Sequence, residues 1–367
     1  MRHTLVIIFA LFNGILYANS GDYRININIK GLPENCEALL KDFESNTDIN
    51  RTRIENGKAT IKGQIQNGPR LLFLTVLAGA NSYWCNFMIG NEEVWLTASV
   101  NDFPFKVHVK GSPVNDVFYA LNLQLADDRM RRDSLFTRAK SIMAAPEYKT
   151  ELKRLVREMA VIDSMEIVTK KEFIEANLQS HPAVLELFLL RSSYEKEEVA
   201  NMYLLLSDSL KASAYGIKLK NYLGIAKIVA KGDKVFPFTA VDKDGKTFSF
   251  PIANNKFLLL DFTKDYCPPC VQSVKELKEI SKKYGSQLEV IGFSPDEKQS
   301  WLKGLQRDQP TWLCLWDGKG SAGPVMLNYG VQAYPTFVLV DAAGIVVARS
   351  VGYSAGSLQQ LLLPFLK

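Results

Sequence analysis

The fold is decided by one stretch, Phe257-Leu258-Leu259-Leu260-Asp261-Phe262-Thr263-Lys264-Asp265-Tyr266-Cys267-Pro268-Pro269-Cys270. Its apolar beginning, 257–262, reads as a buried strand, and the amphipathic residues 271–280 read as a helix. Cys267 therefore lies where a strand turns into a helix, and the two prolines fit the first helical turn. Unpaired backbone N–H groups and the helix dipole favour a thiolate at such a position. We expect Cys267 to have a pKa below that of a free thiol.

Two cysteines separated by two residues carry out thiol–disulfide exchange or form half of a zinc site. A zinc site needs two more ligands at a suitable spacing. The other cysteines, Cys36, Cys85 and Cys314, are isolated, and histidines occur only at positions 3, 108 and 181. The motif therefore favours redox chemistry with no metal and no cofactor.

Two more features accompany the cysteine pair. Asp261 lies six positions before Cys267 inside an apolar strand, where a carboxylate is costly to bury unless it has a use or reaches water. In the segment 331–341, the step Pro335-Thr336 opens a second apolar strand, which is followed by a turn at 342–344 and a further strand at 345–348. A proline at such a place is a candidate for a cis peptide bond, and an ordinary trans proline at a sheet edge is the alternative.

With these pieces, residues 230–367 resemble the thioredoxin-fold domain of the TlpA/ResA-like thiol–disulfide oxidoreductases. The resemblance implies an α/β thioredoxin fold in which Cys267 is the nucleophile and Cys270 the resolving cysteine. It also implies that Asp261 relays protons to Cys270 and that Pro335 is the cis-proline facing the cysteines. Besides the cysteine motif, the matching segments are Gly232-Asp233-Lys234-Val235-Phe236-Pro237-Phe238, Asp244-Gly245-Lys246, Leu260-Asp261-Phe262, Asn328-Tyr329-Gly330-Val331 and Tyr334-Pro335-Thr336.

The residues beside the cysteines and the proline are the expected substrate contacts: Tyr266, Pro268, Pro269, Tyr334 and Thr336. The chain departs from the family pattern at Tyr266, where tryptophan is usual, and at Thr263, Ser273 and Lys275. Lys264 and Asp265 add charge next to the motif. These departures bear on the redox potential and on the choice of partner.

Residues 1–20 are typical of a secretory signal peptide: Arg2, an apolar core at 5–12, and small residues at Ala18 and Ser20 where cleavage fits. No cysteine lies near the cleavage zone, so a lipoprotein anchor is not expected. No later apolar run reaches about 18 residues, so we expect no transmembrane segment in the mature chain. The expected location is the periplasm.

The charges exclude some classes of partner. The chain has 44 Lys and Arg against 39 Asp and Glu, a formal charge of +5, with both signs interspersed. The densest basic cluster, Arg129, Arg131 and Arg132, is flanked by acids and is typical of a solvated helix face. There is no basic stripe and no glycine-rich phosphate loop, so nucleic acid is not an expected partner.

The first 229 residues divide into two regions ahead of the thioredoxin-like domain. Residues 21–111 alternate in the rhythm of strands at 23–29, 58–63, 71–76, 93–98 and 105–109, which predicts an all-β, sandwich-like module. It resembles the β domain of unknown function that often precedes TlpA-like domains in certain Gram-negative bacteria. Residues 112–229 carry apolar side chains at helical spacing and predict four or five helices. The chain is thus expected to be multidomain.

The remaining cysteines leave alternatives open. Cys36 and Cys85 fall in the β module, where they either pair as a structural disulfide or stay separate buried thiols. Cys314 lies on an apolar strand and is interpreted as a buried inert thiol, with a third redox cysteine as the alternative.

The leading functional interpretation is a periplasmic thiol–disulfide oxidoreductase that reduces disulfides of envelope proteins through Cys267 and Cys270. Its partners are protein thiols and disulfides of the envelope and an electron donor that the sequence does not identify. Reduction during cytochrome c maturation is one role known in the family. The alternative from another class is a binding or scaffold protein of the envelope with a secondary redox domain. A thiol peroxidase is disfavoured because Thr263 stands four residues before Cys267, whereas peroxidases need three.

Overall fold

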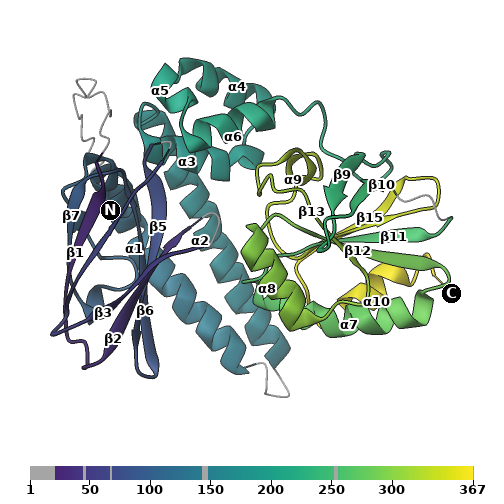
Figure 1. Ribbon diagram of the computed structural model, residues 1–367, viewed down its shortest axis with the longest axis horizontal. Coiled ribbons are helices and arrows are strands. Elements are labelled where there is room, and N and C mark those ends of the chain that lie inside the picture. The colour runs from purple at the N-terminus through teal and green to yellow at the C-terminus, as the bar shows by residue number, and fades with distance from the viewer. Residues whose placement is uncertain (1–20, 44–46, 67, 143–147, 252–254, 367) are drawn as a thin grey trace. The chain divides into compact units, whose positions relative to one another are not determined.

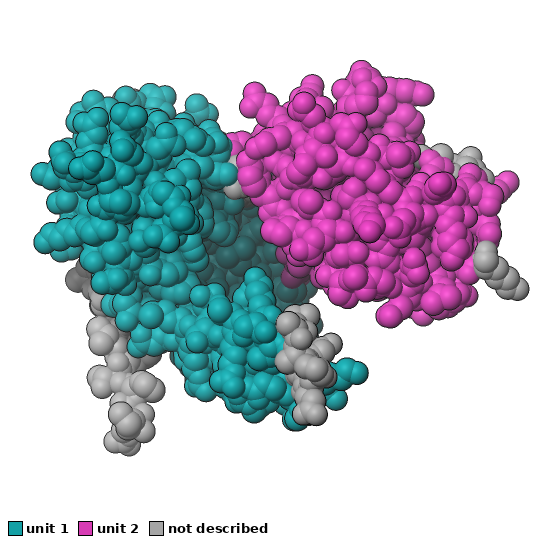
Figure 2. Space-filling view, turned by 90° about the horizontal axis from the view of Figure 1, so that it is seen from below, with its two compact units in different colours: residues 1–44, 48–220 teal, residues 45–47, 221–367 magenta. Residues whose placement is uncertain are grey.

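The computed structural model describes residues 21–43, 47–66, 68–142, 148–251 and 255–366 (Figure 1). The signal peptide expected at 1–20 lies outside these ranges. The chain divides into two compact units, coloured separately in Figure 2. Unit 1 comprises Met1–Glu44 and Asp48–Lys220, and unit 2 consists mainly of Asn221–Lys367. Within the described ranges no helix combines the length and apolar composition that a membrane crossing needs.

Unit 1 begins with a sandwich of two four-stranded sheets, ordered β4-β1-β7-β8 and β3-β2-β5-β6. Side chains from both sheets meet in one apolar core. In β1 the buried residues are Tyr23, Ile25, Ile27 and Ile29, so the alternation in the sequence is the alternation between core and solvent. The strands are β1 (Tyr23–Lys30), β2 (Cys36–Asp42), β3 (Asp48–Ile54), β4 (Lys58–Gly63), β5 (Arg70–Ala78), β6 (Asn81–Ile89), β7 (Glu93–Ser99) and β8 (Val109–Lys110).

The sandwich confirms the expected all-β module, but three of its strands escape the alternation pattern. β2 is buried at nearly every position, and β6 has buried residues in succession at its end. β3 alternates in burial but consists mostly of polar residues, so none of the three shows an apolar period of two in its sequence. The strand expected at 105–109 is wrong: only Val109–Lys110 pairs there, and the chain before it turns around a cis peptide bond between Phe103 and Pro104.

Helices fill the rest of unit 1, as the change of period at Ser112 predicts. They are α1 (Pro113–Ile142), α2 (Tyr148–Ala176), α3 (His181–Leu189), α4 (Lys196–Leu205), α5 (Asp208–Lys211) and α6 (Ala214–Leu223), the last of which crosses into unit 2. Asn115 joins α1 to the sandwich, since its buried amide accepts from the Met88 N–H at 3.0 Å and donates to the Val109 carbonyl at 2.7 Å. The β strands and the first helices therefore form one unit and not two.

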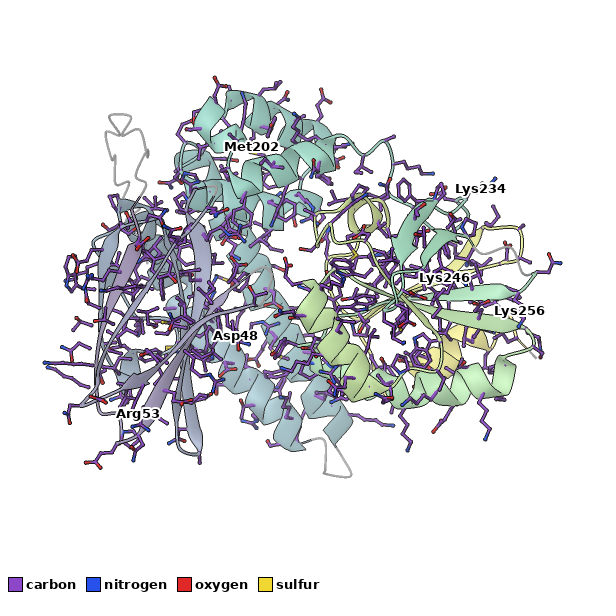
Figure 3. All side chains as sticks on the ribbon, viewed as in Figure 1. Asp48, Arg53, Met202, Lys234, Lys246 and Lys256 are labelled. Atoms are coloured by element: carbon purple, nitrogen blue, oxygen red, sulfur yellow. A yellow bond between two sulfur atoms is a disulfide. The ribbon has the colours of Figure 1, made fainter. Side chains whose placement is uncertain are left out.

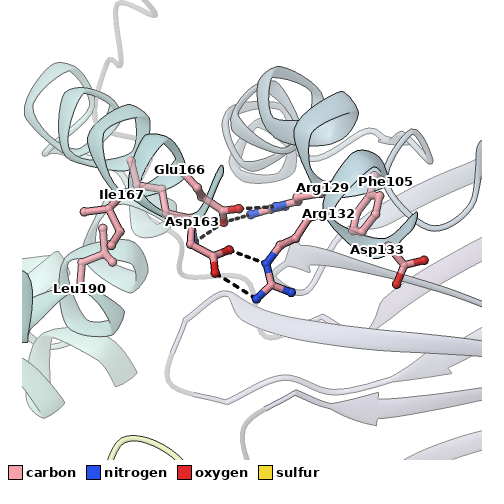
Figure 4. Close-up of a pocket in the computed structure, with 9 residues that line it drawn as sticks. Phe105, Arg129, Arg132, Asp133, Asp163, Glu166, Ile167 and Leu190 are labelled. Atoms are coloured by element: carbon pink, nitrogen blue, oxygen red, sulfur yellow. Dashed lines mark hydrogen bonds and ion pairs between the residues drawn. The ribbon is translucent and has the colours of Figure 1, made fainter. Parts of the chain in front are cut away.

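The basic cluster of α1 is partly exposed and also forms ion pairs with the next helix. Arg129 pairs with Glu166 of α2 at 2.8 Å, and Arg132 pairs with Asp163 (Figure 4). Further pairs, Arg131–Glu158 and Arg138–Glu151, follow the same antiparallel order. The sequence of α1 does not predict these ion pairs because the acidic partners lie on the next helix. A cavity of about 450 Å³ opens beside the pairs, and its arginines, Glu166 and Asp163 are engaged with one another.

Unit 2 is built on a seven-stranded sheet in the order β10-β9-β13-β12-β11-β14-β15. β11, β12 and β13 are parallel, and β14 is antiparallel to β11. The strands are β9 (Phe238–Val241), β10 (Thr247–Phe250), β11 (Phe257–Phe262), β12 (Leu288–Ser294), β13 (Leu313–Trp316), β14 (Thr336–Val340) and β15 (Val346–Val351). The helices are α7 (Pro268–Tyr284), α8 (Lys298–Asp308), α9 (Pro324–Asn328) and α10 (Ser357–Leu362).

Two apolar cores lie on opposite faces of this sheet. Leu258, Leu260 and Phe262 of β11 pack on the side of α9, and Leu259 packs on the side of α7 and α10. The expected α/β thioredoxin fold is therefore present. The β9–β10 hairpin turns at Gly245, which takes a positive φ of 82°, and the Lys246 beside it is labelled in Figure 3.

Candidate redox site

Cys267 and Cys270 are joined by a disulfide at the start of α7. Cys267 is the residue that caps this helix, and its sulfur accepts from the Cys270 N–H at 3.2 Å. Pro268 and Pro269 occupy the first helical turn, as the sequence predicts, where a backbone N–H would have no partner within the helix. In this oxidised form both cysteines are buried, with 8% of Cys267 and 3% of Cys270 exposed. Cys267 is thus only slightly more exposed than Cys270 in this form.

The register of the sheet brings Pro335 to the same edge as the cysteines. β11 ends at Phe262, which is paired with Thr336, the first residue of the antiparallel β14. The loop to Cys267 leaves β11 at this point, and Pro335 immediately precedes β14 there. The Tyr334–Pro335 peptide bond is cis, as the sequence predicts.

Asp261 occupies the last but one position of β11 and points to the α7 face, because it follows Leu259 in the strand alternation. Only 5% of the residue is exposed, and its Oδ1 has no hydrogen-bond partner among the described residues. Burial, and after it the nearby carboxylate of Asp308, raises the pKa of Asp261 to about 7. The buried acid expected at this position is present with a raised pKa, and its role as a proton relay stays a prediction.

The residues expected to touch a substrate differ in exposure. Tyr266 is half exposed, Pro268 is exposed, and Pro269 and Tyr334 are partly exposed. Thr336 is fully buried, and its hydroxyl donates to the Ala333 carbonyl at 2.7 Å. Contact between Thr336 and a substrate stays a prediction, and its buried side chain holds the turn around Pro335.

A set of charged residues around the redox loop was not singled out from the sequence. Asp296 follows β12 and accepts from the Asp265 N–H at 2.7 Å. Arg307 of α8 donates to the Asp265 carboxylate at 2.6 Å, and Lys303 donates to the Tyr266 hydroxyl at 2.9 Å. One signal was available: Asp296 follows a strand parallel to β11, and the carboxyl ends of parallel strands share an edge of the sheet. The contacts from α8 have no local signal.

The remaining cysteines are free thiols. Cys36 and Cys85 are both buried in unit 1 and are not bonded to each other. Cys314 is only partly buried, and it leans over Gly292, where an added Cβ would lie 3.0 Å from its sulfur. Burial and the carboxylates of Asp261 and Asp308 raise the pKa of Cys314 to about 12, which favours the neutral thiol.

Comparisons with known proteins agree with this arrangement. A thioredoxin-like family model matches residues 254–346, and a model of a domain of unknown function matches residues 23–118. The thiol:disulfide interchange protein DsbE of Allochromatium vinosum is 30% identical over 154 residues, which cover 37% of this chain and 82% of that protein. The chain belongs to the thiol–disulfide oxidoreductases with a thioredoxin-like domain.

Other members of the family are more distant. The thiol-disulfide oxidoreductase ResA of Bacillus anthracis is 27% identical over 116 residues, 31% of this chain and 66% of that protein. A solved structure of a thiol-disulfide oxidoreductase from Bacteroides fragilis aligns with a TM-score of 0.34 at 24% identity, over 36% of this chain and 100% of that one. The oxidoreductase described here is thus an enzyme of thiol–disulfide exchange, with unit 1 added ahead of the thioredoxin-like domain.

Proposed function

We propose that this oxidoreductase is a periplasmic reductase of disulfides in cell-envelope proteins, and that Cys267 and Cys270 carry the exchange. The observation that supports this most is a cysteine pair at a helix start, in the same unit as a buried carboxyl with a pKa of about 7. The apolar segment at 5–12 and the small residues after it support export.

The proposed reaction starts from the dithiol form. The Cys267 thiolate attacks one sulfur of the substrate disulfide, and the other substrate sulfur leaves as a thiolate that takes a proton. Cys270 then gives its proton to the Asp261 carboxylate, and its thiolate attacks the Cys267 sulfur of the mixed disulfide. The second substrate thiolate leaves, and the Cys267–Cys270 bond closes. The substrate gains two electrons, and an envelope dithiol donor must return two electrons to the enzyme.

Asp261 suits the second step because burial sets its pKa close to the ambient pH. A carboxylate with an ordinary pKa of about 3.9 would rarely accept the proton of Cys270 at neutral pH. The exposed residues Tyr266 and Pro268, together with Tyr334 beside Pro335, form the proposed contact surface for the substrate. Backbone groups before Pro335 pair with the substrate chain in this proposal, since the Pro335 carbonyl already accepts from Gly352 at 2.8 Å.

The test is insulin reduction by the full chain, with Cys267→Ser and Cys270→Ser as variants. We expect both to lose turnover, and only Cys270→Ser to accumulate a mixed disulfide with a target, because Cys267 still attacks while the resolving thiol is absent. Asp261→Asn should form the mixed disulfide normally and release it about tenfold or more slowly. Trapped envelope proteins would identify substrates.

Two results would contradict the proposal. Wild-type protein that fails to reduce insulin would favour the binding or scaffold role, in which unit 1 holds a partner. A reduction potential well above those of envelope reductases, with oxidation of target dithiols faster than reduction of disulfides, would reverse the direction of the reaction.

A further inference from the structure

One face of α8 holds the two residues that precede Cys267. Lys303 donates to the Tyr266 hydroxyl at 2.9 Å, and Arg307 donates to both the carboxylate and the backbone carbonyl of Asp265, at 2.6 and 2.8 Å. Between them, Gly304 also faces Asp265, at a distance where an added Cβ would make an ordinary van der Waals contact, 3.5 Å from the Asp265 Cβ. Since helix positions three and four apart share a face, α8 contacts the redox loop through one face.

The contacts place a buried charge beside the reactive cysteine. The Asp265 side chain is 1% exposed, and its Oδ2 has no hydrogen-bond partner among the described residues. Its other oxygen meets Arg307, whose guanidinium also pairs with Asp308 at 2.7 Å. A buried carboxylate is costly unless a cation compensates it. Arg307 is therefore the cation that compensates the buried carboxylate of Asp265, two residues before Cys267.

The ionisable groups around this loop come from three further places. Asp261 lies on β11, Asp296 follows β12, and Lys264 stands between Asp296, 3.9 Å from its ammonium, and the Tyr334 ring, 5.4 Å from it. The acids are buried, and the cations lie outside them: 5% of the Asp296 side chain is exposed against 39% of Arg307. Each buried acid in these ion pairs is thus compensated by a more exposed cation. Removing one residue of such an ion pair leaves the charge of the other uncompensated.

We propose that Asp265 and Arg307 are positioning residues for Cys267, a linked pair that fixes the loop before the cysteine and sets how readily its thiolate forms. This inference rests on the proposed function, in which Cys267 is the attacking thiol. It names a second acid near the site, with a role distinct from that of Asp261, which serves Cys270.

The two residues should act with opposite signs. Asp265→Asn removes a negative charge and leaves Arg307 near Cys267, which favours the thiolate. Arg307→Gln leaves the carboxylates of Asp265 and Asp308 uncompensated, which disfavours it. A neighbouring unit charge in a partly buried site changes the ratio of thiolate to thiol by about tenfold. A purely structural role predicts otherwise, because both variants loosen the same contact and would shift reactivity in the same direction.

The experiment measures alkylation of Cys267 by iodoacetamide against pH in the reduced full-length protein, with mass spectrometry to identify the labelled residue. We expect the midpoint to fall by about one pH unit in Asp265→Asn and to rise by about one in Arg307→Gln. The double variant should return to within about half a unit of wild type, because one charge of each sign is lost. Arg307→Lys keeps the charge and should stay near wild type even if Arg307→Gln fails to fold.

The matched control is Lys227→Ala, which breaks the exposed Lys227–Asp233 ion pair in the same unit and should leave the midpoint unchanged. Shifts of the same sign in Asp265→Asn and Arg307→Gln, or no shift in either, would overturn the inference. Wild-type protein whose Cys267 alkylates readily but reduces no insulin would instead count against the proposed function alone.

Discussion

Asp261 shows how a single residue links stability to chemistry. A carboxyl whose pKa is raised in the folded state binds its proton more tightly there. Its contribution to folding is then complete below the unfolded pKa of about 3.9 and is lost as the pH rises to about 7. The residue that serves turnover therefore weakens the fold at the pH where the enzyme works, which is a common compromise at functional sites.

We predict that Asp261→Asn becomes more stable relative to wild type as the pH rises from 4 to 8. The gain should reach about 4 kcal/mol at most, the linkage value for a pKa shift from 3.8 to about 7. Urea unfolding of the oxidised proteins at several pH values measures it. Asp244→Asn, at an exposed turn of the same unit, should show no such trend. A difference between Asp261→Asn and wild type that does not change with pH would mean that Asp261 has an ordinary pKa.

The cysteines make a second prediction at the residue scale. In the reduced native protein at pH 7, iodoacetamide should label Cys267 first, and Cys36, Cys85 and Cys314 about a hundredfold or more slowly. The reason is burial, which raises the pKa of all three thiols, that of Cys314 to about 12. Peptide mapping after brief labelling measures this. Early labelling of Cys314 would revive the hypothesis of a third redox cysteine.

Sequence reasoning succeeded at the residues whose signal is local. The cysteine motif, the acid inside an apolar strand and the proline at a strand start are each visible within a few positions. Arg307 is 42 residues from Asp265, and nothing near either residue indicates their contact. Thr336 shows a different limit, since its neighbours place it at the site but β14 is buried at every position, the Thr336 side chain included.

Among the secondary-structure elements, α10 depends on a residue of another helix. Its N-cap is Gly356, which has no side chain to cap the helix. Glu276 of α7 replaces that cap: its carboxylate accepts from the Gly356 N–H at 3.0 Å and from the Gln359 N–H at 2.9 Å. The carboxylate also faces the positive end of the helix dipole. This buried acid thus joins α10 to the helix that carries the cysteines.

We predict that Glu276→Ala lowers the free energy of unfolding by about 2–3 kcal/mol, because two buried N–H groups lose a charged acceptor. Glu279→Ala, at an exposed position of the same helix, should change it by less than about 0.5 kcal/mol. Urea unfolding of both variants at pH 7 measures the difference. Equal effects of the two substitutions would show that solvent replaces the Glu276 cap.

The elements that the sequence predicted are those with a regular burial period. β1 and β11 were predicted because one alternates between core and solvent and the other is an apolar run of strand length. β2 was missed because it is buried at nearly every position, and β3 was missed because its alternating positions carry mostly polar residues. The ion pairs of α1 were not predicted because the acids that compensate its arginines lie on α2. The sequence of one helix does not show which residues of another helix it contacts.

At the scale of the whole molecule, the chain has two units that each contain apolar cores and that differ in their additional stabilising contacts. Unit 1 ties its two longest helices with ion pairs, Arg129–Glu166 and Arg138–Glu151 among them. Unit 2 contains the one disulfide found in the described residues and packs two apolar cores against a central sheet. The boundary was expected near residue 230, and the compact unit begins at Asn221.

We predict that these units unfold in separate transitions that respond to different conditions. Reduction by dithiothreitol should lower only the transition of unit 2, by about 2 kcal/mol, because the Cys267–Cys270 bond restricts its unfolded chain. Raising the salt concentration from 0.05 to 0.5 M should weaken mainly unit 1, since its partly exposed ion pairs are screened. Hydrogen exchange followed by mass spectrometry assigns each transition, because peptides from 48–220 and from 221–366 report on different units.

The matched control is Cys267→Ser, whose unit 2 should already unfold at the lower midpoint and no longer respond to dithiothreitol. A single transition that reductant moves for peptides of both units would show that the chain unfolds as one cooperative body, and the assignment of separate stabilities would be wrong.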